Sequence, residues 1–200
     1  MDMETLDVGS GSHPKGTVNV DLNRKFKPTV VAEARSLPFR GSVFDEVHLS
    51  HILEHVVDPE NILKEAYRVL KAEKHVKIVF PNFASLGVFV AWLTQFYLGS
   101  RRILNFPHII PSKLQMPYSI IYGSHTIGKY DVHHVPLTLR LMCDLLKEIG
   151  FDIKSIKGEG FLLPFRRVSF VRALGRALAK IFPSRADIVT VIALKRGYKE

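Results

Sequence analysis

The segment 5–22 constrains this chain most, because it places two short apolar runs on either side of a glycine turn. The first run, Thr5–Val8, leads directly into Gly9-Ser10-Gly11, and the second run, Val18–Asp21, ends in an acid. Glycines allow a sharp turn and a close approach to a ligand, and an acid at the end of the next strand can accept both hydrogen bonds of a ribose diol. The segment predicts a nucleoside-binding turn, but an ordinary turn can have the same Gly-x-Gly pattern.

The composition bounds the class of protein. Two hundred residues, 46% hydrophobic and 24% charged, suit one globular α/β domain with a full core. The longest apolar run, 86–98, is too short to cross a bilayer, so we expect a cytoplasmic protein. The single cysteine, Cys143, excludes disulfide frameworks and cysteine-rich metal sites.

Strand-like and helix-like segments alternate over the first hundred residues, which is typical of a parallel sheet covered by helices. The expected strands are Thr5–Val8, Val18–Asp21, Thr29–Ala32, Phe44–Leu49, His75–Phe80, Phe151–Ile156 and Ile188–Leu194. The expected helices are one that Asp58 and Pro59 open, Ser85–Leu98, Thr138–Ile149 and Arg167–Ile181. Pro, Gly, His and Tyr are frequent in 101–135, and we expect one domain over 1–200 with an insertion at 83–135.

Together these segments resemble the class I S-adenosylmethionine-dependent methyltransferases, in particular the type 11-like methyltransferases, over nearly the whole chain. The matching motifs are Leu6–Pro14, Asn19–Asp21, Ala32–Phe39, Phe44–Val56, Arg68–Lys71 and Phe80–Asn82. The resemblance implies an α/β, Rossmann-like seven-stranded sheet in the order 3-2-1-4-5-7-6, with strand seven antiparallel and helices on both faces. It also implies methyl transfer from S-adenosyl-L-methionine to an acceptor that the sequence does not identify, with 83–135 as an acceptor-side cap.

The chain departs from the family pattern at the glycine turn. Ser12 and His13 stand where a third glycine is usual, and the connection between the first two strands is very short. This leaves little room for a full first helix. We therefore expect a cofactor that is open at its methionine end and is held there by few contacts.

The resemblance assigns nine residues to the cofactor: Asp7, Gly9, Gly11, Asp21, Glu33, Ala34, Leu37, Ser50 and His51. Asp7 would lie near the ammonium group, the two glycines along the methionine moiety, and Asp21 at the ribose hydroxyls. Each acid also has a simpler interpretation, since Asp7 could cap a turn and Asp21 could pair with Arg24 or Lys25. Acids at the ends of consecutive parallel strands favour the ligand, because such sheets bind ligands there.

The remaining assignments concern the adenine and the transferred methyl group. By the resemblance, Glu33 accepts from the adenine amino group, the N–H of Ala34 serves a ring nitrogen, and Leu37 packs against the ring. Glu33 could instead be a solvated strand end. Ser50 and His51 would face the methyl group, with Pro81 and Asn82 at the neighbouring strand end.

Methyl transfer is a displacement at a carbon that positive sulfur already activates, so alignment of the nucleophile supplies much of the rate. Some acceptors also need a general base, and the candidate catalytic histidines are His134, His133 and His51. The first two lie in a stretch that resembles the segment closing the acceptor side of these enzymes, although a histidine there could simply bond a loop carbonyl. His51 and His55 have the i, i+4 spacing of zinc ligands, but they match the family's turn after strand four, and we expect no metal.

The C-terminal part of the chain is basic. Residues 161–200 contain nine Lys or Arg against two Asp or Glu, within a net charge of +9 for the whole chain. In 167–181 Val171, Leu174, Leu178 and Ile181 share one helical face, and Arg172, Arg176 and Lys180 recur on another. This pattern favours contact with RNA or an anionic membrane, which would make the protein peripheral at the membrane, or else a helix packed on the sheet with a solvated basic face.

Two other classes of protein compete with a methyltransferase. A nicotinamide-dependent dehydrogenase would need Gly-x-Gly-x-x-Gly, and Pro14 stands at the last glycine position, which disfavours it. A non-catalytic S-adenosylmethionine-binding module that works through the basic helix stays open, as does a methyltransferase directed at RNA.

Overall fold

The computed structural model describes residues 3–86, 136–160 and 169–197, and it contains one seven-stranded sheet. The strands are β1 (Thr5–Val8), β2 (Val18–Asp21), β3 (Val30–Val31), β4 (Phe44–Ser50), β5 (Leu70–Pro81), β6 (Phe151–Glu159) and β7 (Ile188–Lys195). Their order is β3-β2-β1-β4-β5-β7-β6, and β7 is antiparallel to both of its neighbours while β3, β2, β1, β4 and β5 pair in parallel. The predicted fold class and strand order are confirmed.

Three helices accompany the sheet in the described ranges: α1 (Pro59–Val69), α4 (Leu139–Ile149) and α5 (Ser169–Ile181). The caps explain the bounds of the first two. Asp58 accepts the N–H of Asn61 at the start of α1, and Thr138 accepts the N–H of Leu141 at the start of α4. Gly150 ends α4 in the left-handed region, as the sequence predicted.

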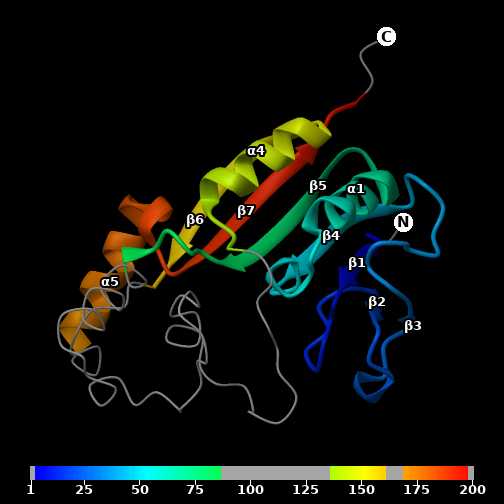
Figure 1. Cartoon of the computed structure of the whole chain (residues 1–200), viewed down its shortest axis with the longest axis horizontal. Helices are drawn as coiled ribbons and strands as arrows, with labels where there is room; N and C mark the ends of the chain where they lie inside the picture. Colours follow the sequence, from blue (N-terminus) through cyan, green and yellow to red (C-terminus); the bar gives the residue numbers. More distant parts are fainter. Residues whose placement is uncertain (1–2, 87–135, 161–168, 198–200) are drawn as a thin grey trace.

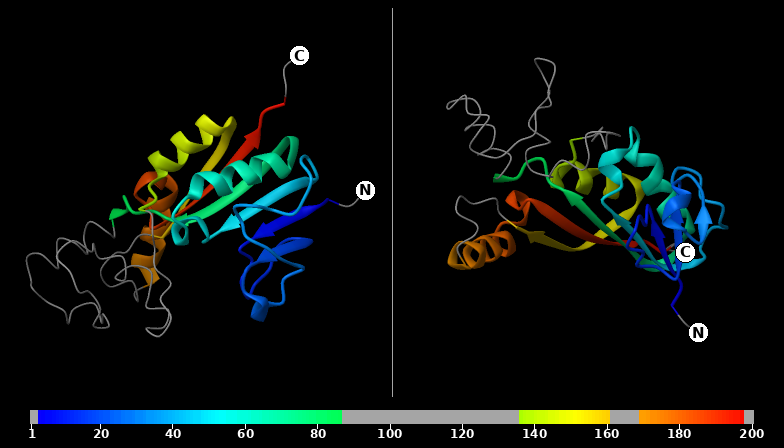
Figure 2. Two further views of the ribbon diagram at one scale, coloured as in Figure 1. Left: turned by 45° about the vertical axis from the view of Figure 1, so that its right-hand side comes forward. Right: turned by 90° about the horizontal axis from the view of Figure 1, so that it is seen from below.

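Helices α1 and α4 lie next to each other on one face of the sheet (Figure 1). Ile62, Leu63 and Ala66 of α1 and Met142 and Leu146 of α4 are fully buried there. They pack in one cluster with the inward side chains of the strands, such as those of Val47, Ile78 and Val191. Helix α5 packs against β6 at the edge of the sheet, away from the other two helices (Figure 2).

None of the three described helices covers the β1–β3 part of the sheet (Figure 1). From Thr5 to Ser50, a stretch that the structure describes throughout, the only helical element is the short 3-10 helix η1 (Arg24–Phe26). The connection from β1 to β2 is a loop that forms no helix. The prediction that the short connection leaves no room for a first helix is confirmed.

Several predicted bounds differ from those observed. Strand β5 begins at Leu70 instead of His75, because the chain passes from α1 directly into the strand and Leu70 pairs with Phe44. Strand β6 continues to Glu159. The predicted helix Ser85–Leu98 and the predicted cap 83–135 fall almost entirely on 87–135, outside the described residues.

Candidate functional site

Asp7 is the buried acid at the end of β1. Its side chain is 2% exposed, and Oδ2 accepts the backbone N–H of Lys15 at 2.7 Å. Burial raises the pKa of Asp7, while the hydrogen bond from Lys15 and the nearby His48 and Lys15 charges act in the opposite direction. The turn-capping interpretation of Asp7 is therefore correct for this contact, and the contact also fixes the carboxylate at the carboxyl end of the strand.

The glycine turn that follows is tied to β2. The N–H groups of Gly9 and Ser10 both donate to the carbonyl of Val20, at 2.8 and 3.2 Å. Gly11 has φ +56°, and no heavy atom lies within 4 Å of the place where its Cβ would stand. The turn thus presents open space beside Gly11 at the carboxyl end of β1.

Asp21 ends β2 beside this turn. Its Oδ2 accepts the N–H of Gly11 at 2.9 Å, and its Oδ1 accepts the N–H of Asn23 at 2.8 Å. Pairing with Arg24 or Lys25, the simpler interpretation of this acid, is not observed. Each carboxylate oxygen has two lone pairs, so a carboxylate held in this way can still accept hydrogen bonds from a diol.

The segment that the resemblance assigns to the adenine border is held by α1. The N–H of Leu37 donates to Oε2 of Glu65 at 2.8 Å, and Arg68 donates to the carbonyls of Leu37 and Phe39 at 3.0 and 2.7 Å. Glu65 and Arg68 also pair with each other, and this hydrogen bond lowers the pKa of Glu65. Sequence reasoning did not find this clamp, although Arg68 belongs to one of the matching motifs.

Glu33 and Ala34 lie just before this segment. Glu33 is exposed and its carboxylate pairs with Arg35, which donates from Nε at 2.6 Å. Ala34 is half-buried and packs against the core. The solvated alternative for Glu33 therefore describes its observed surroundings, and a contact of Glu33 with adenine stays a prediction.

Ser50 and His51 stand at the carboxyl end of β4. The N–H of His51 donates to the carbonyl of Val79, and the residue adopts φ +55°. Its ring is about half exposed, and Nδ1 lies 3.3 Å from Oε1 of Glu54. Glu54 is 2% exposed, and its second oxygen, Oε2, forms no hydrogen bond within the described part of the chain. A buried carboxylate thus orients the His51 imidazole at the strand end.

The carboxyl ends of β1, β2 and β4 therefore bring Asp7, Gly11, Asp21, Ser50 and His51 to one edge of the sheet. A family model described as a methyltransferase domain matches residues 6–77, which include all of these residues. The chain has the fold of the class I methyltransferases, and its residues 6–77 match a methyltransferase domain. A search of curated proteins returns no match to it.

Solved structures agree with this fold. An S-adenosylmethionine-dependent methyltransferase from Methanosarcina mazei is 19% identical with a TM-score of 0.59, and the match covers 98% of this chain and 94% of that one. A second one, from Archaeoglobus fulgidus, is 18% identical with a TM-score of 0.56, over 96% of this chain and 86% of that one. The [4+2]-cyclase SpnF is also similar, at 14% identity and a TM-score of 0.54, over 98% and 76%. The fold of this methyltransferase domain therefore does not by itself fix its reaction.

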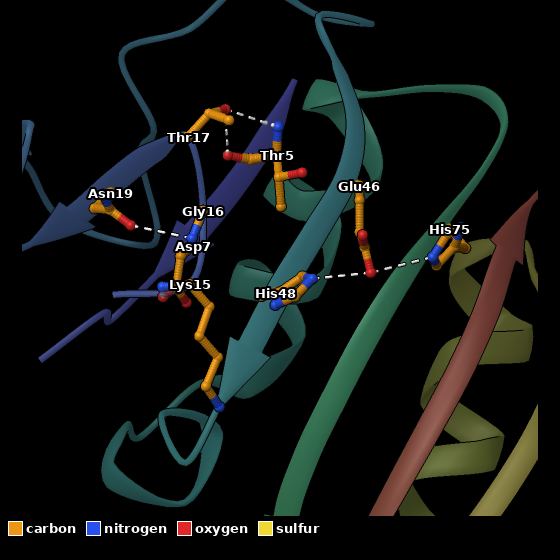
Figure 3. A network of polar contacts seen from close by, with 9 residues as sticks. All are labelled: Thr5, Asp7, Lys15, Gly16, Thr17, Asn19, Glu46, His48 and His75. Carbon is orange, nitrogen blue, oxygen red and sulfur yellow. Dashed lines mark hydrogen bonds and ion pairs between the residues drawn. The ribbon is translucent and has the colours of Figure 1, made fainter. Parts of the chain in front are cut away.

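Lys15 of the methyltransferase domain was missed by sequence reasoning. Its side chain runs from the β1–β2 loop toward the tip of β4, where Nζ lies 3.4 Å from Oγ of Ser50 (Figure 3). The loop that carries it is closely fitted, because a Cβ on Gly16 would lie 2.7 Å from the backbone of both Thr5 and Asp7. The only sequence signal was a lysine within an unusually short connection.

The other residues named from the sequence either lie outside the described residues or make structural contacts. His133 and His134 lie outside the described residues, so their role stays a prediction. Asn82 is completely buried, and its amide donates to the carbonyls of Ser184 and Ala186, so its side chain fastens the segment before β7. Among the described residues, no group of three or more His, Cys, Asp or Glu could hold a metal ion.

Proposed function

We propose that this protein transfers a methyl group from S-adenosylmethionine to an acceptor and releases S-adenosylhomocysteine. The observation that carries the proposal is the carboxylate of Asp21, fixed by the N–H of Gly11 at the end of β2, beside open space in the glycine turn. In a doubly wound sheet this is the place for an acid that accepts the hydroxyls of a ribose. The domain match over 6–77 supports the same proposal.

The cofactor would lie across the carboxyl ends of the strands. Its methionine moiety would pass Gly9 and Gly11 with the ammonium group toward Asp7, and its ribose would bond Asp21. The adenine would pack on Leu37, which Glu65 and Arg68 hold in place. Glu33 and the N–H of Ala34 are the proposed polar partners of the adenine edge, and Glu33 would have to share its carboxylate with Arg35.

In the reaction, a lone pair of the acceptor forms a bond to the methyl carbon while the S–CH₃ bond breaks. The electron pair of that bond returns to sulfur, and the sulfonium becomes a neutral thioether. Ser50 and His51, at the end of β4, would border the transferred methyl group. The main task of the protein is to align the acceptor with the S–CH₃ bond, since the cofactor is already activated.

An acceptor that carries a proton needs a base, and His51 is the described candidate. A hydrogen bond from Nδ1 to Glu54 leaves Nε2 with its lone pair, which can take the proton of an acceptor hydroxyl or ammonium. His133 and His134 stay candidates on the acceptor side.

We place the protein in the cytoplasm. Within the described ranges no helix is long and apolar enough to cross a membrane.

Calorimetry with S-adenosylhomocysteine tests the cofactor. We expect saturable binding, at least about a hundredfold weaker in Asp21→Ala because two hydrogen bonds to the ribose are lost, each of about 1.5 kcal/mol. Asp144→Ala, at an exposed position on α4, is the matched control and should bind like the original protein. Absence of binding by the original protein contradicts the proposal.

Incubation of lysate fractions with methyl-labelled S-adenosylmethionine tests the reaction. Label that enters one class of molecule names the acceptor class, and label in RNA supports the RNA-directed alternative. Cofactor binding without transfer to any fraction would indicate the non-catalytic module instead. His51→Ala should then lower turnover by about a hundredfold with little change in cofactor affinity, if His51 is the base.

A further inference from the structure

Helix α5 exposes two of the apolar residues that the sequence pattern assigned to one face, and a third, Leu178, is half-buried. Leu174 is 43% exposed and Ile181 is 65% exposed, and Phe182, directly after the helix, is 53% exposed. The side that packs on β6 is formed by Gly175 and Ala179, which are buried. Leu174 and Ile181 of α5 therefore lie outside the core.

The close contact between α5 and β6 explains this arrangement. A Cβ on Gly158 of β6 would lie 2.4 Å from the carbonyl oxygen of Ala179 and 2.6 Å from Cβ of Ala186. The backbone of the helix touches the strand, so only small residues fit between the two elements. Leu174 and Ile181 are displaced toward the solvent.

The adjoining face of the helix is positively charged. Arg176 and Lys180 are exposed one turn apart, and Arg185 is exposed in the 3-10 helix η3 (Pro183–Arg185). The helix Ser169–Ile181 contains no acidic residue. Cations beside exposed leucine, isoleucine and phenylalanine are the composition of a helix that lies in the plane of a membrane surface.

The surface also lies on the cofactor edge of the sheet. Ile188 pairs with both Pro81 and Glu159, so β5 and β6 end at the same edge, and Ser50 at the end of β4 pairs with Val79 near the end of β5. Figure 1 shows α5 beyond these strand ends. A surface that binds α5 would therefore lie near the side from which an acceptor approaches.

We propose that α5 and η3 form a docking surface for anionic lipid bilayers. Arg176, Lys180 and Arg185 would lie at the phosphate level, and Leu174, Ile181 and Phe182 would enter the boundary with the acyl chains. The exposed aliphatic side chains favour a membrane over RNA, since an RNA surface offers them no apolar partner. The proposal is independent of the methyl transfer, and it would place the site next to membrane-bound acceptors.

Flotation of the full chain with lipid vesicles tests this surface. We expect binding to phosphatidylcholine vesicles that contain about one quarter phosphatidylglycerol, and at least about tenfold weaker binding to pure phosphatidylcholine. Ile181→Ser with Phe182→Ser, and separately Arg176→Gln with Lys180→Gln, should each weaken binding to the anionic vesicles by about tenfold. Val57→Ser, at an apolar residue that is 78% exposed elsewhere, is the matched control.

Either of two results would overturn the proposal. One is no binding of the original protein to anionic vesicles. The other is a loss with the charge variant but not with the apolar variant, because this indicates a polyanion site, and binding of a single-stranded RNA would then be measured directly. All changed residues are exposed, so equal melting temperatures will show that the variants are folded.

A second inference concerns Lys15 and rests on the proposed function. The amino-acid end of S-adenosylmethionine is a zwitterion, and two charged groups lie near the glycine turn: the carboxylate of Asp7, in β1, and the ammonium group of Lys15, in the β1–β2 loop. In folds of this type an anionic group commonly lies at the N-terminus of the helix after β1. This protein has no helix there, so the carboxylate of the cofactor lacks that partner.

The geometry points to Lys15 as the residue that binds the methionine carboxylate. Its side chain reaches the end of β4, on the side of the glycine turn where the methionine moiety would lie (Figure 3). The contact of Lys15 with Asp7 is made by the backbone N–H, so a change of the side chain leaves it in place. Lys15→Met therefore removes the charge without removing the loop contact.

Two ligands distinguish the loss of a contact with the amino-acid group from the loss of the whole cofactor site. S-adenosylhomocysteine has the amino-acid group, and 5′-methylthioadenosine lacks it. Lys15→Met should weaken S-adenosylhomocysteine by about tenfold and leave 5′-methylthioadenosine unchanged, while Lys25→Met, in η1, should change neither. An unchanged affinity for S-adenosylhomocysteine, or an equal loss for both ligands, contradicts the role of Lys15; failure of the original protein to bind either ligand contradicts the proposed function.

Discussion

The two parts of the sheet are stabilised in different ways. Strands β4 to β7 are covered by α1 and α4, and the strands and these two helices together supply most of the hydrophobic core. Strands β1 to β3 have no α-helix between them in the described stretch 3–86. Their connections are tied by hydrogen bonds between side chains and the backbone, such as the two that join Thr5 and Thr17 and the one from Gly16 to Asn19 (Figure 3).

One face of the neighbouring strands β4 and β5 is also polar. Oε1 of Glu46 lies 2.8 Å from Nε2 of His48 and 3.1 Å from Nε2 of His75, so one carboxylate oxygen contacts two imidazoles on neighbouring strands. The helix-covered part thus contains strands packed under α1 and α4, and the helix-free part contains Asp7, Gly11 and Asp21, the residues proposed to bind the cofactor. The comparison predicts that small changes in the loops of β1 to β3 cost more than their size suggests.

Gly16→Ala is the strongest test of the helix-free part. The added Cβ would stand 2.7 Å from the N of Asp7 and from the O of Thr5, and 2.8 Å from the O of Val18. These are backbone atoms of two strands, so they cannot move aside without breaking the β1–β2 pairing. We expect a loss of roughly 3 kcal/mol or more in the free energy of unfolding, measured by urea denaturation.

Gly41→Ala is the matched control for that change. Its Cβ would meet the carbonyl oxygen of Arg68 at 3.3 Å, and its backbone does not have a positive φ. We expect a change within about 1 kcal/mol. Equal effects at Gly16 and Gly41 would mean that the β1–β2 loop is not the close contact described here.

Lys195→Met tests the helix-covered part. The buried ammonium group donates to the carbonyls of Tyr67 and Leu70, each at 2.7 Å, at the end of α1, and it lies 4.7 Å from the centre of the Tyr67 ring. The change leaves two carbonyls without their charged donor and should cost about 2–3 kcal/mol by urea denaturation. Lys154→Met, at an exposed residue of β6, should change stability by less than about 0.5 kcal/mol.

Elements with local signals were predictable from the sequence. The apolar runs gave β1 and β2 with their observed bounds, and the caps at Asp58, Thr138 and Gly150 gave α1 and α4. The apolar stripe of α5 left two interpretations open, and it did not indicate the close approach at Gly158, which admits only small residues. Contacts between residues that are far apart in the sequence leave no pattern in the local sequence, so they could not be predicted from it.

The candidate site likewise contains residues that the local sequence indicates and residues that it does not indicate. Asp21 was singled out from the local sequence because it ends a strand, and Asp7 was assigned by the family resemblance. Leu37 is held by Glu65 and Arg68, which lie about thirty positions later in the chain. No sequence pattern within α1 indicates this contact. Lys15 was missed because its role depends on the absence of a helix that the chain would otherwise have at this place.

Arg68→Met tests how the two parts are joined. Arg68 connects α1 to the carbonyls of Leu37 and Phe39, in the loop that leads from β3 to β4. We expect about tenfold weaker binding of both S-adenosylhomocysteine and 5′-methylthioadenosine, because the adenine border loses its support. Arg140→Met, at an arginine whose side chain is 94% exposed, should leave both affinities unchanged.

Asp7→Asn should have the smallest effect on the fold, and it should be stabilising. Burial raises the pKa of Asp7 above its unfolded value, so its contribution to stability is fully present below the ordinary pKa of an aspartate and is lost as the pH rises through the folded pKa. At pH 7 the buried charge therefore costs stability, and the amide, which can still accept the N–H of Lys15, removes that cost. We expect a higher melting temperature than the original protein at about pH 7, a difference that shrinks toward about pH 4, and weaker binding of S-adenosylhomocysteine. A lower melting temperature at neutral pH would show that the charge of Asp7 supports the β1–β2 loop instead of being held there for a ligand.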